Sequence, residues 1–330
     1  MERQRGEIEI FAERLKNAGK AVHAQAHRLT VPIELMALHG RVERLWPPLF
    51  IIGPPRSGTT LLYQLLAGSC EFAYFPNIAN RFYLCPAAAT RFAKRWCRPY
   101  SSSYRSHLGF EKGCMAPSEA GSIWNRWFPH EKREGFNVTP AGYLGEDDCS
   151  QIRRTVSSIE TICRAPFLCK NVKMSVRLPA IRRLFPDALF LRIRRDPLHA
   201  ALSILAVRRR RAVSWWSVLP GAMEDFAGRP DYEQACHQVY QTERRINDGL
   251  APLDAKQHFS LWYQDLCDNP GDELGRIGRF IEKGGGTFVR RTSKIPDRFP
   301  LSQPDADPWI APEEVSRMKG IIKGLFAGVS

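Results

Sequence analysis

Hydrophobic positions along the chain fall into two patterns that alternate with one another. Four short apolar runs are typical of buried strands: 49–52, 167–169, 188–193 and 258–263. Between and after them, apolar residues recur every three or four positions, which predicts helices at 61–66, 178–185, 198–207 and 269–281. Strands that alternate with helices favour an α/β fold with a central parallel sheet covered by helices on both faces.

The remaining segments are less regular. Residues 7–46 carry apolar positions among many charges and predict two amphipathic helices, so we treat 1–46 as an N-terminal helical segment. Residues 76–150 are aromatic and irregular, and we expect short helices and long loops there. A C-terminal amphipathic helix is expected within 313–330. Because no internal repeat or linker is evident, residues 1–330 are expected to form a single domain.

Composition narrows the function classes. With 330 residues, of which 44% are hydrophobic, the chain can build a sizeable core, and this excludes a disordered or fibrous protein. The 48 Lys and Arg residues outnumber the 34 Asp and Glu residues, giving a net charge of +14. An anionic partner is therefore expected, and charge alone leaves nucleic acid, an acidic membrane and a phosphorylated small molecule open.

The cysteines, the histidines and the N-terminal sequence bear on location and metals. The nine cysteines are odd in number and scattered without Cys-x-x-Cys spacing, so we expect reduced thiols, not a disulfide framework or a zinc site. The histidines show no metal-ligand spacing, so no metal is expected. Without a secretion signal or an apolar stretch of about 18 residues, the expected location is cytoplasmic and no transmembrane segment is expected.

The clearest motif is the sequence Gly-Pro-Pro-Arg-Ser-Gly-Thr-Thr at 53–60, between a predicted strand and a predicted helix. Such a loop directs backbone N–H groups and a helix N-terminus toward one point, an arrangement suited to phosphate. In the nucleotide-hydrolysing motif G-x-x-x-x-G-K-[ST] a lysine reaches the terminal phosphates, whereas Thr59 occupies that position here. The loop thus keeps the backbone features that bind an anion but lacks the lysine that ATP or GTP hydrolysis requires. The alternative is a tight turn with no ligand.

A second candidate anion site follows the strand at 188–193. Arg195 is expected at the carboxyl end of this strand, where open α/β sheets bind ligands, and its guanidinium presents a fork of donors to phosphate. Ser203 follows on the next helix, and Arg208 could add a further contact. Alternatively, Arg195 pairs with Asp196 or solvent.

These segments resemble the sulfotransferases that use 3′-phosphoadenosine 5′-phosphosulfate (PAPS). The sequence Pro-Arg-Ser-Gly-Thr-Thr-Leu-Leu at 55–62 resembles their 5′-phosphosulfate-binding loop, and Arg195 with Ser203 eight residues later resembles their 3′-phosphate site. Phe-Ser-Leu-Trp-Tyr-Gln-Asp-Leu-Cys-Asp-Asn-Pro at 259–270 is similar to a third family segment. The resemblance implies a P-loop-like three-layer fold and metal-independent transfer of a sulfuryl group from PAPS to a hydroxyl or amine. It implies these nucleotide-binding residues: Pro55, Arg56, Ser57, Gly58, Thr59, Thr60, Arg195, Ser203, Arg208 and Tyr263.

The catalytic residues are less well defined. By analogy with phosphoryl transfer, Arg56, which is also a catalytic candidate, would hold the nucleotide end together with the loop amides. Lys170 or Lys173 would stabilise charge on the bridging oxygen, although either lysine could be an ordinary surface residue. The tyrosine-protein branch of the family has a Glu about twenty-one residues after the loop Arg, where this chain has Asn77. The candidate bases are therefore those of the segment 106–127, which resembles bacterial sulfotransferase-like proteins: Glu119 and His107.

Two other functions remain open from the sequence. One is a P-loop-type kinase or nucleotide-binding protein, and the other is a non-catalytic anion-binding protein that uses the net positive charge. No nucleic-acid-reading motif is evident, so the expected partners are a nucleotide donor and an unidentified acceptor. The tryptophan pairs at 124/127 and 215/216 could line an acceptor pocket, but core positions are the more common role of such residues. The oligomeric state is not specified.

Overall fold

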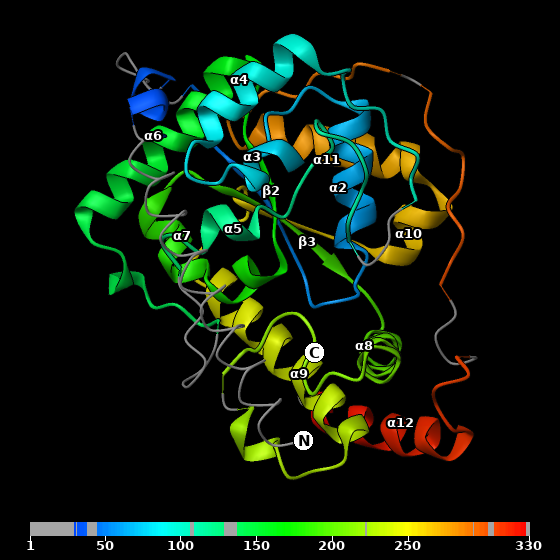
Figure 1. The fold of residues 1–330 in the computed structure, drawn as a ribbon. Helices are drawn as coiled ribbons and strands as arrows, with labels where there is room; N and C mark the ends of the chain where they lie inside the picture. The colour runs from blue at the N-terminus through cyan, green and yellow to red at the C-terminus, as the bar shows by residue number, and fades with distance from the viewer. Residues whose placement is uncertain are drawn as a thin grey trace, which may run out of the picture.

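The computed structural model describes residues 30, 32–37, 45–105, 109–128, 137–221, 223–292, 294–302 and 307–327. Within these ranges four parallel strands form one sheet in the order β2-β1-β3-β4. The strands are β1 (Leu49–Ile52), β2 (Leu168–Lys170), β3 (Leu189–Arg194) and β4 (His258–Trp262). Helices lie on both faces of this sheet (Figure 1). The prediction of an α/β fold with a central parallel sheet flanked by helices is confirmed.

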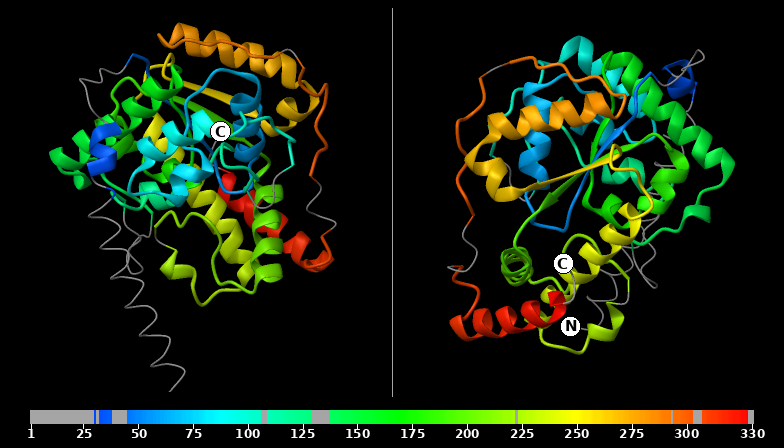
Figure 2. Two further views of the ribbon diagram at one scale, coloured as in Figure 1. Left: turned by 45° about the horizontal axis from the view of Figure 1, so that its top comes forward. Right: turned by 180° about the vertical axis from the view of Figure 1, so that it is seen from behind.

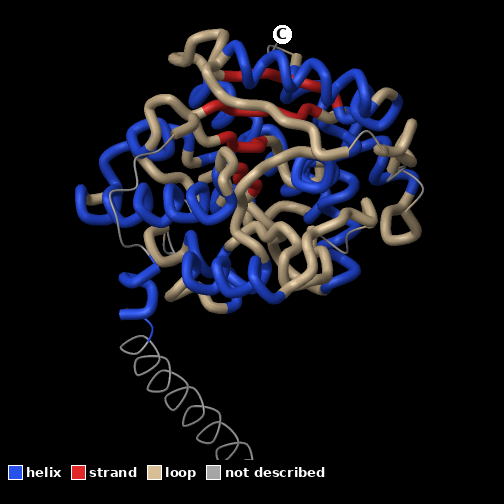
Figure 3. The backbone as a smooth tube through the Cα atoms, turned by 90° about the horizontal axis from the view of Figure 1, so that it is seen from above, coloured by secondary structure: helices blue, strands red, loops and turns tan. Residues whose placement is uncertain are grey.

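The two faces of the sheet follow from the side-chain alternation of its strands. Leu49 and Ile51 of β1 point to one face, whereas Phe50 and Ile52 point to the other. The first face is covered by α2 (Thr59–Ser69), α10 (Tyr263–Asp268) and α11 (Pro270–Lys283). The second is covered by α5 (Gly121–Trp124), α6 (Glu146–Cys163) and α7 (Leu178–Leu184). Seen from above, the strands lie between blue helices, the three layers of the fold (Figure 3).

Three further helices form a separate apolar cluster: α8 (Pro197–Arg211), α9 (Asp231–Leu250) and α12 (Pro312–Phe326). They lie together at the lower end of the molecule in Figure 1 and in both views of Figure 2. The expected C-terminal helix is therefore present as α12. The sequence pattern did not identify α9, because its buried face includes the polar side chains Gln234, Gln238, Thr242 and Glu243.

The connections place a ligand-binding crevice between β1 and β3. After β1 the chain crosses to β2 on one side through a long segment, and it then returns to β3 on the other side of β1. This reversal of strand order is the topological switch point at which α/β sheets bind ligands, outside the carboxyl ends of the strands. The two sequence motifs follow β1 and β3, the strands on either side of this point.

The long crossover from β1 to β2 contains the irregular region that the sequence predicts. It holds short helices, with α3 (Asn77–Arg81), α4 (Pro86–Trp96) and the single-turn α5, separated by loops. The longer helix α6 begins inside the region 76–150 that the sequence predicts to be irregular, and it continues past residue 150 to Cys163. The prediction of two N-terminal helices lies mostly outside the described residues.

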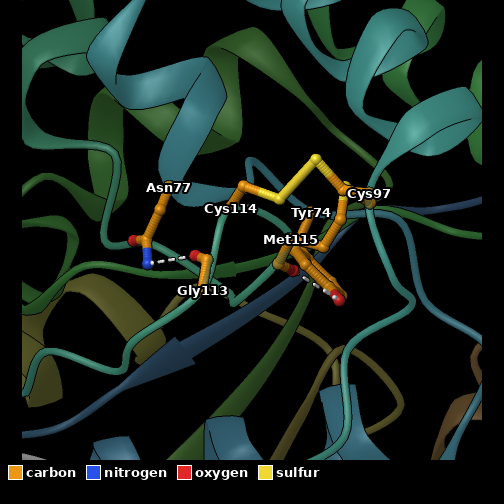
Figure 4. Close-up of a disulfide and its surroundings, with 6 residues drawn as sticks. All are labelled: Tyr74, Asn77, Cys97, Gly113, Cys114 and Met115. Atoms are coloured by element: carbon orange, nitrogen blue, oxygen red, sulfur yellow. Dashed lines mark hydrogen bonds between the residues drawn. A yellow bond between two sulfur atoms is a disulfide. The ribbon is translucent and has the colours of Figure 1, made fainter.

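One cysteine pair departs from the expectation of reduced thiols. Cys97, which follows α4, forms a disulfide with Cys114, seventeen residues later (Figure 4). The other seven cysteines are free. The expectation is wrong for this pair because folding of the crossover brings together residues whose sequence spacing has no recognised pattern. In the same region Asn77 Nδ2 donates to the Gly113 carbonyl (2.9 Å) and the Tyr74 hydroxyl donates to that of Met115 (3.2 Å).

Candidate active site

The loop between β1 and α2 has the backbone geometry of an anion cradle. Arg56 and Gly58 both have positive φ angles, of 68° and 99°. A Cβ at position 58 would lie 2.4 Å from the Tyr263 ring, so this position requires glycine for space as well as for conformation. No side chain caps the N-terminus of α2, and its first turn holds no acidic residue. Its first amides and the positive end of its dipole are therefore available to an anion.

The structure brings the two predicted anion motifs into direct contact. Arg56 Nε donates a hydrogen bond to Ser203 Oγ (2.9 Å), although the residues are 147 positions apart. Arg195 Nη1 donates to the backbone carbonyl of Arg56 (2.8 Å), and Nη2 donates to that of Ser302 (3.1 Å). The Arg195 guanidinium also lies over the Tyr263 ring, 4.6 Å from its centroid. In Figure 1 the blue loop that precedes α2 lies beside the arrowhead of β3.

The electrostatics of this junction favour a bound anion. Burial lowers the pKa of Arg56, and the neighbouring charge of Arg195 lowers it further. Burial also lowers the pKa of Arg195. Neither guanidinium forms a salt bridge with a carboxylate of the described residues, and the fully buried Ser57 Oγ has no hydrogen-bond partner among them. Two cations and a buried hydroxyl without acidic partners are a donor set that fits the phosphate groups of a nucleotide.

A second polar cluster lies at the carboxyl end of β2. Lys170 is almost fully buried, and its ammonium group donates to Thr60 Oγ1 (2.9 Å) and forms an ion pair with the Glu119 carboxylate. Asn171 Nδ2 donates to the backbone carbonyl of Glu119 (2.9 Å), which holds the segment that carries it. The Glu119 side chain is 37% exposed. This carboxylate is thus accessible from the cleft while a buried cation orients it.

Lys173 lies one turn beyond Lys170, in the 3₁₀-helix Val172–Val176. Burial, together with the charge of Arg177, lowers its pKa from its ordinary value of 10.5 to about 8. The negative charge of the nearby Glu119 raises the pKa of Lys173 and so opposes this shift in part. The same short helix also supports the anion loop, because the Ser175 hydroxyl accepts from Gly53 N and donates to Gly53 O, both at 3.0 Å.

Both clusters open into one cleft of about 830 Å³. Its lining includes the predicted residues Pro55, Arg56, Gly58, Thr59, Thr60, Glu119, Arg195 and Tyr263. The lining also includes residues that the nucleotide motifs do not contain: Asn77, Asn80, Phe110, Pro117, Asn125 and Trp216. A cavity of this size accommodates a nucleotide together with part of a second molecule.

Other predicted residues lie elsewhere. Arg208 does not line the cleft; its guanidinium donates to the Asp231 carbonyl (3.2 Å) and to Gln234 Oε1 (2.7 Å), so it joins α8 to α9. Its predicted phosphate contact stays a prediction, because in this structure its two Nη atoms donate to groups inside the protein. His107 lies outside the described residues. Trp124 and Trp127 are core residues, the more common role for such a pair.

Sequence reasoning missed several parts of this site. Ser302 contributes only a backbone carbonyl to Arg195, and Ser175 acts on backbone atoms of the anion loop. Neither role depends on a recognisable motif, so nothing in the sequence pattern marks these residues. No group of three or more potential metal ligands occurs among the residues that the structure describes. Within the same ranges, no helix combines the length and the apolar character that crossing a membrane requires.

A parallel sheet with an anion loop at its switch point defines a P-loop-like α/β protein. The family profile described as "Sulfotransferase family" matches residues 47–283, which include the whole sheet and both motifs. The chain therefore belongs to the sulfotransferase family.

Individual relatives are more distant. The omega-hydroxy-beta-dihydromenaquinone-9 sulfotransferase Stf3 of Mycobacterium bovis is 23% identical over 256 residues, which cover 72% of this chain and 63% of that protein. The protein of the same name from Mycobacterium tuberculosis matches equally well. The chain thus spans less than two thirds of the length of these curated relatives. Among solved structures, sulfotransferase STF9 from Mycobacterium avium has the same fold, with a TM-score of 0.51 and 18% identity over 88% of this chain and 78% of that chain.

Proposed function

We propose that this protein is a PAPS-dependent sulfotransferase that transfers the sulfuryl group to a hydroxyl of its acceptor. The observation that carries the proposal is the junction of Arg56, Ser203 and Arg195, which joins two anion motifs at one end of a single cleft. The amides of the loop and of the first turn of α2, with Arg56 and Ser57, would hold the 5′-phosphosulfate. Arg195 and Ser203 would hold the 3′-phosphate, and Tyr263 supports both motifs by packing against Arg195 and Gly58.

The mechanism follows from the charges around the cleft. Bound PAPS supplies a sulfuryl group activated by its anhydride bond to phosphate. The Glu119 carboxylate takes the proton from the acceptor hydroxyl while the oxygen of that hydroxyl forms its bond to sulfur. Lys170 and the guanidinium of Arg56 offset the negative charge that develops on the oxygen released from sulfur, and the buried position of Lys170 strengthens this effect. Thr60 accepts a hydrogen bond from Lys170 and so helps to position the ammonium group.

The acceptor is proposed to be an amphiphilic alcohol. The acceptor side of the cleft combines the rings of Phe110 and Trp216 with the amide side chains of Asn80 and Asn125, a lining suited to a partly apolar molecule. The name of the relative Stf3 specifies an omega-hydroxy-dihydromenaquinone, which also carries a hydroxyl group. A cytoplasmic location remains a prediction.

The test is a thermal-shift measurement with adenosine 3′,5′-bisphosphate, the product of the donor. A ligand that binds only the native state raises the melting temperature, by an amount that grows with concentration above Kd. The wild type should show this shift without magnesium, and Arg56→Ala and Arg195→Ala should lose at least about tenfold in affinity because each removes a charged donor. Arg194→Ala is the matched control, since its exposed guanidinium lies over the Trp262 ring.

Three outcomes would contradict the proposal. A folded wild type that shows no shift does not bind this nucleotide. Equal losses in Arg194→Ala and Arg195→Ala would indicate a general effect of positive charge, as expected for a non-catalytic anion-binding protein. A thermal shift that requires ATP and magnesium would favour a P-loop-type kinase. The loop argues against this function, because Thr59 occupies the position of the lysine that P-loop enzymes require.

A further inference from the structure

The helix α4 carries large aromatic side chains on its outer face and small ones on its inner face. Its buried residues are Pro86, Ala87, Ala89, Thr90 and Ala93. Phe92 and Trp96, one turn apart, are 61% and 69% exposed, with ring centroids 6.4 Å from each other. Phe82, just before α4, is also more than half exposed. A helix that packs only within its own domain buries its large apolar residues, so the fold leaves the outer face of α4 without an apolar partner among the described residues.

The charges around these rings have one sign. Residues 81–105 contain six basic residues and no acidic residue: Arg81, Arg91, Lys94, Arg95, Arg98 and Arg105. Arg91, Arg95 and Arg98 are exposed on or directly after α4, and the Arg95 guanidinium lies 5.0 Å from the centre of the Trp96 ring. We refer to Phe82, Arg91, Phe92, Arg95, Trp96 and Arg98 together as the α4 surface.

The carboxylates that contact this region are turned inward. Glu34 is buried, and its two oxygens accept from the backbone N–H groups of Ala87 (3.1 Å) and Ala88 (3.0 Å) at the start of α4. Glu111 accepts from the hydroxyl of Tyr100. These carboxylates therefore satisfy groups inside the protein, and the positive charge of the α4 surface faces outward.

We propose that the α4 surface binds the interface of an anionic lipid membrane. Aromatic rings on one stripe of a helix insert at the level of the headgroups, while flanking basic side chains extend to the lipid phosphates. The helix would lie in the plane of the membrane and would not cross it. Single-stranded nucleic acid, by contrast, is bound in grooves, and the α4 surface lines neither the cleft nor the groove beside α6.

The position of the α4 surface connects it to the acceptor side of the cleft. The helix α3, which precedes it, contributes Asn77 and Asn80 to the cleft lining. The disulfide after α4 ties Cys97 to the segment that carries the exposed ring of Phe110, which also lines the cleft. A membrane-bound orientation would therefore bring the acceptor side close to molecules dissolved in the bilayer. This inference goes beyond the proposed reaction and does not depend on it.

The test is co-sedimentation of the full chain with vesicles of phosphatidylcholine alone or mixed with phosphatidylglycerol. The wild type should bind the mixed vesicles more tightly, and added salt should weaken the binding. Because each basic residue near an anionic surface contributes about a fivefold change in affinity, Arg91→Gln with Arg95→Gln should lower the partition coefficient by roughly twentyfold or more. Phe92→Gln with Trp96→Gln should lower it by at least about tenfold.

The matched control is Lys319→Gln with Lys323→Gln, which removes the same charge from exposed positions of α12. This helix lies at the opposite end of the molecule from α4 (Figures 1 and 2). Lack of vesicle binding, or an equal loss in this control, would overturn the proposal. Binding of a short oligonucleotide that the α4 variants abolish, with no vesicle binding, would instead assign the surface to nucleic acid. The thermal shift with adenosine 3′,5′-bisphosphate should persist in all these variants. A failure of the membrane-binding proposal is therefore distinguishable from a failure of the proposed function.

Discussion

The two walls of the cleft are built in different ways. The nucleotide wall consists of the loop after β1, the start of α2 and the end of β3, and side-chain hydrogen bonds such as that from Arg195 to the Arg56 carbonyl hold it together. The acceptor wall consists of α3, residues 109–125, the start of the 3₁₀-helix Val172–Val176 and Trp216. Backbone hydrogen bonds, such as that from Ser118 N to the Phe75 carbonyl (3.0 Å), and the Cys97–Cys114 disulfide join the segments 74–78 and 97–118. A wall built on the edge of a sheet is fixed by local sequence and topology, whereas a wall built from loops depends on contacts between distant residues.

The largest effect is expected from Glu119→Gln, because this variant should impair the reaction at the acceptor wall and leave nucleotide binding at the other wall unchanged. The amide keeps the shape of the side chain but cannot accept the acceptor proton, so kcat should fall by about 10²–10⁴-fold. The shift in melting temperature with adenosine 3′,5′-bisphosphate should stay close to that of the wild type, because Glu119 lies outside the anion loop. The measurements are initial rates with PAPS and an accepted alcohol, together with the thermal shift.

The matched control for this variant is Glu111→Gln. Glu111 belongs to the same segment of the acceptor wall but is absent from the cleft lining, and it accepts a hydrogen bond from Tyr100. Its kcat should change by only a few-fold. Near-normal turnover in Glu119→Gln would eliminate Glu119 as the base, and a strongly impaired Glu111→Gln would show that the assay reports damage to the whole wall.

A smaller effect, confined to the acceptor wall, is expected from Cys97→Ser with Cys114→Ser. A crosslink over a loop of this length stabilises the folded state by about 3 kcal/mol, mainly by restricting the unfolded chain. Denaturant unfolding should detect that loss, and the KM for the acceptor should rise while the affinity for adenosine 3′,5′-bisphosphate is unchanged. Cys163→Ser, which alters a free and partly buried thiol, is the control. An equal loss of nucleotide affinity would contradict the separation of the two walls.

The difference between the walls also explains how far the sequence predicted the molecule. The anion loop and Arg195 were identifiable because short motifs follow buried strands, and the alternation of strands and helices then brings the motifs to one edge of the sheet. Arg208 shows the limit of this reasoning. It has the residue type of a phosphate ligand, but α9, which the sequence pattern did not reveal, supplies its partners.

The segments that the sequence did not reveal share a physical cause. The helices α6 and α9 bury polar side chains, among them Thr155 and Ser158 in α6 and Gln238 in α9. Thr155 and Ser158 donate to carbonyls four residues earlier, those of Gln151 and Arg154 (both 2.8 Å), whereas Gln238 Nε2 donates to the carbonyls of Trp216 and Val218 outside its helix. Hydrophobic periodicity is therefore weak in these helices although they are buried. The contacts of the acceptor wall, including the ion pair of Glu119 with Lys170, join residues that no sequence spacing relates.

The smallest expected effect is a pH dependence of stability that arises at Lys173 on the acceptor wall. Burial, with the charge of Arg177, lowers the pKa of Lys173 in the folded protein to about 8, whereas an unfolded chain keeps this proton until about pH 10.5. Between these values the unfolded state binds more protons, so the free energy of unfolding rises with pH. Below pH 8 both states are protonated, and the destabilising effect of the buried charge is fully present.

Lys173→Gln removes this titration and tests whether the acceptor wall holds a partly buried cation at neutral pH. The variant should melt above the wild type at pH 7, and the difference should shrink as the pH rises from 8 to 10, because the wild type regains stability there. Lys323→Gln, at an exposed position of α12, should show a difference from the wild type that does not vary over this range. A Lys173→Gln difference that stays constant with pH would mean that Lys173 is ordinarily solvated and that the two walls do not differ in this respect.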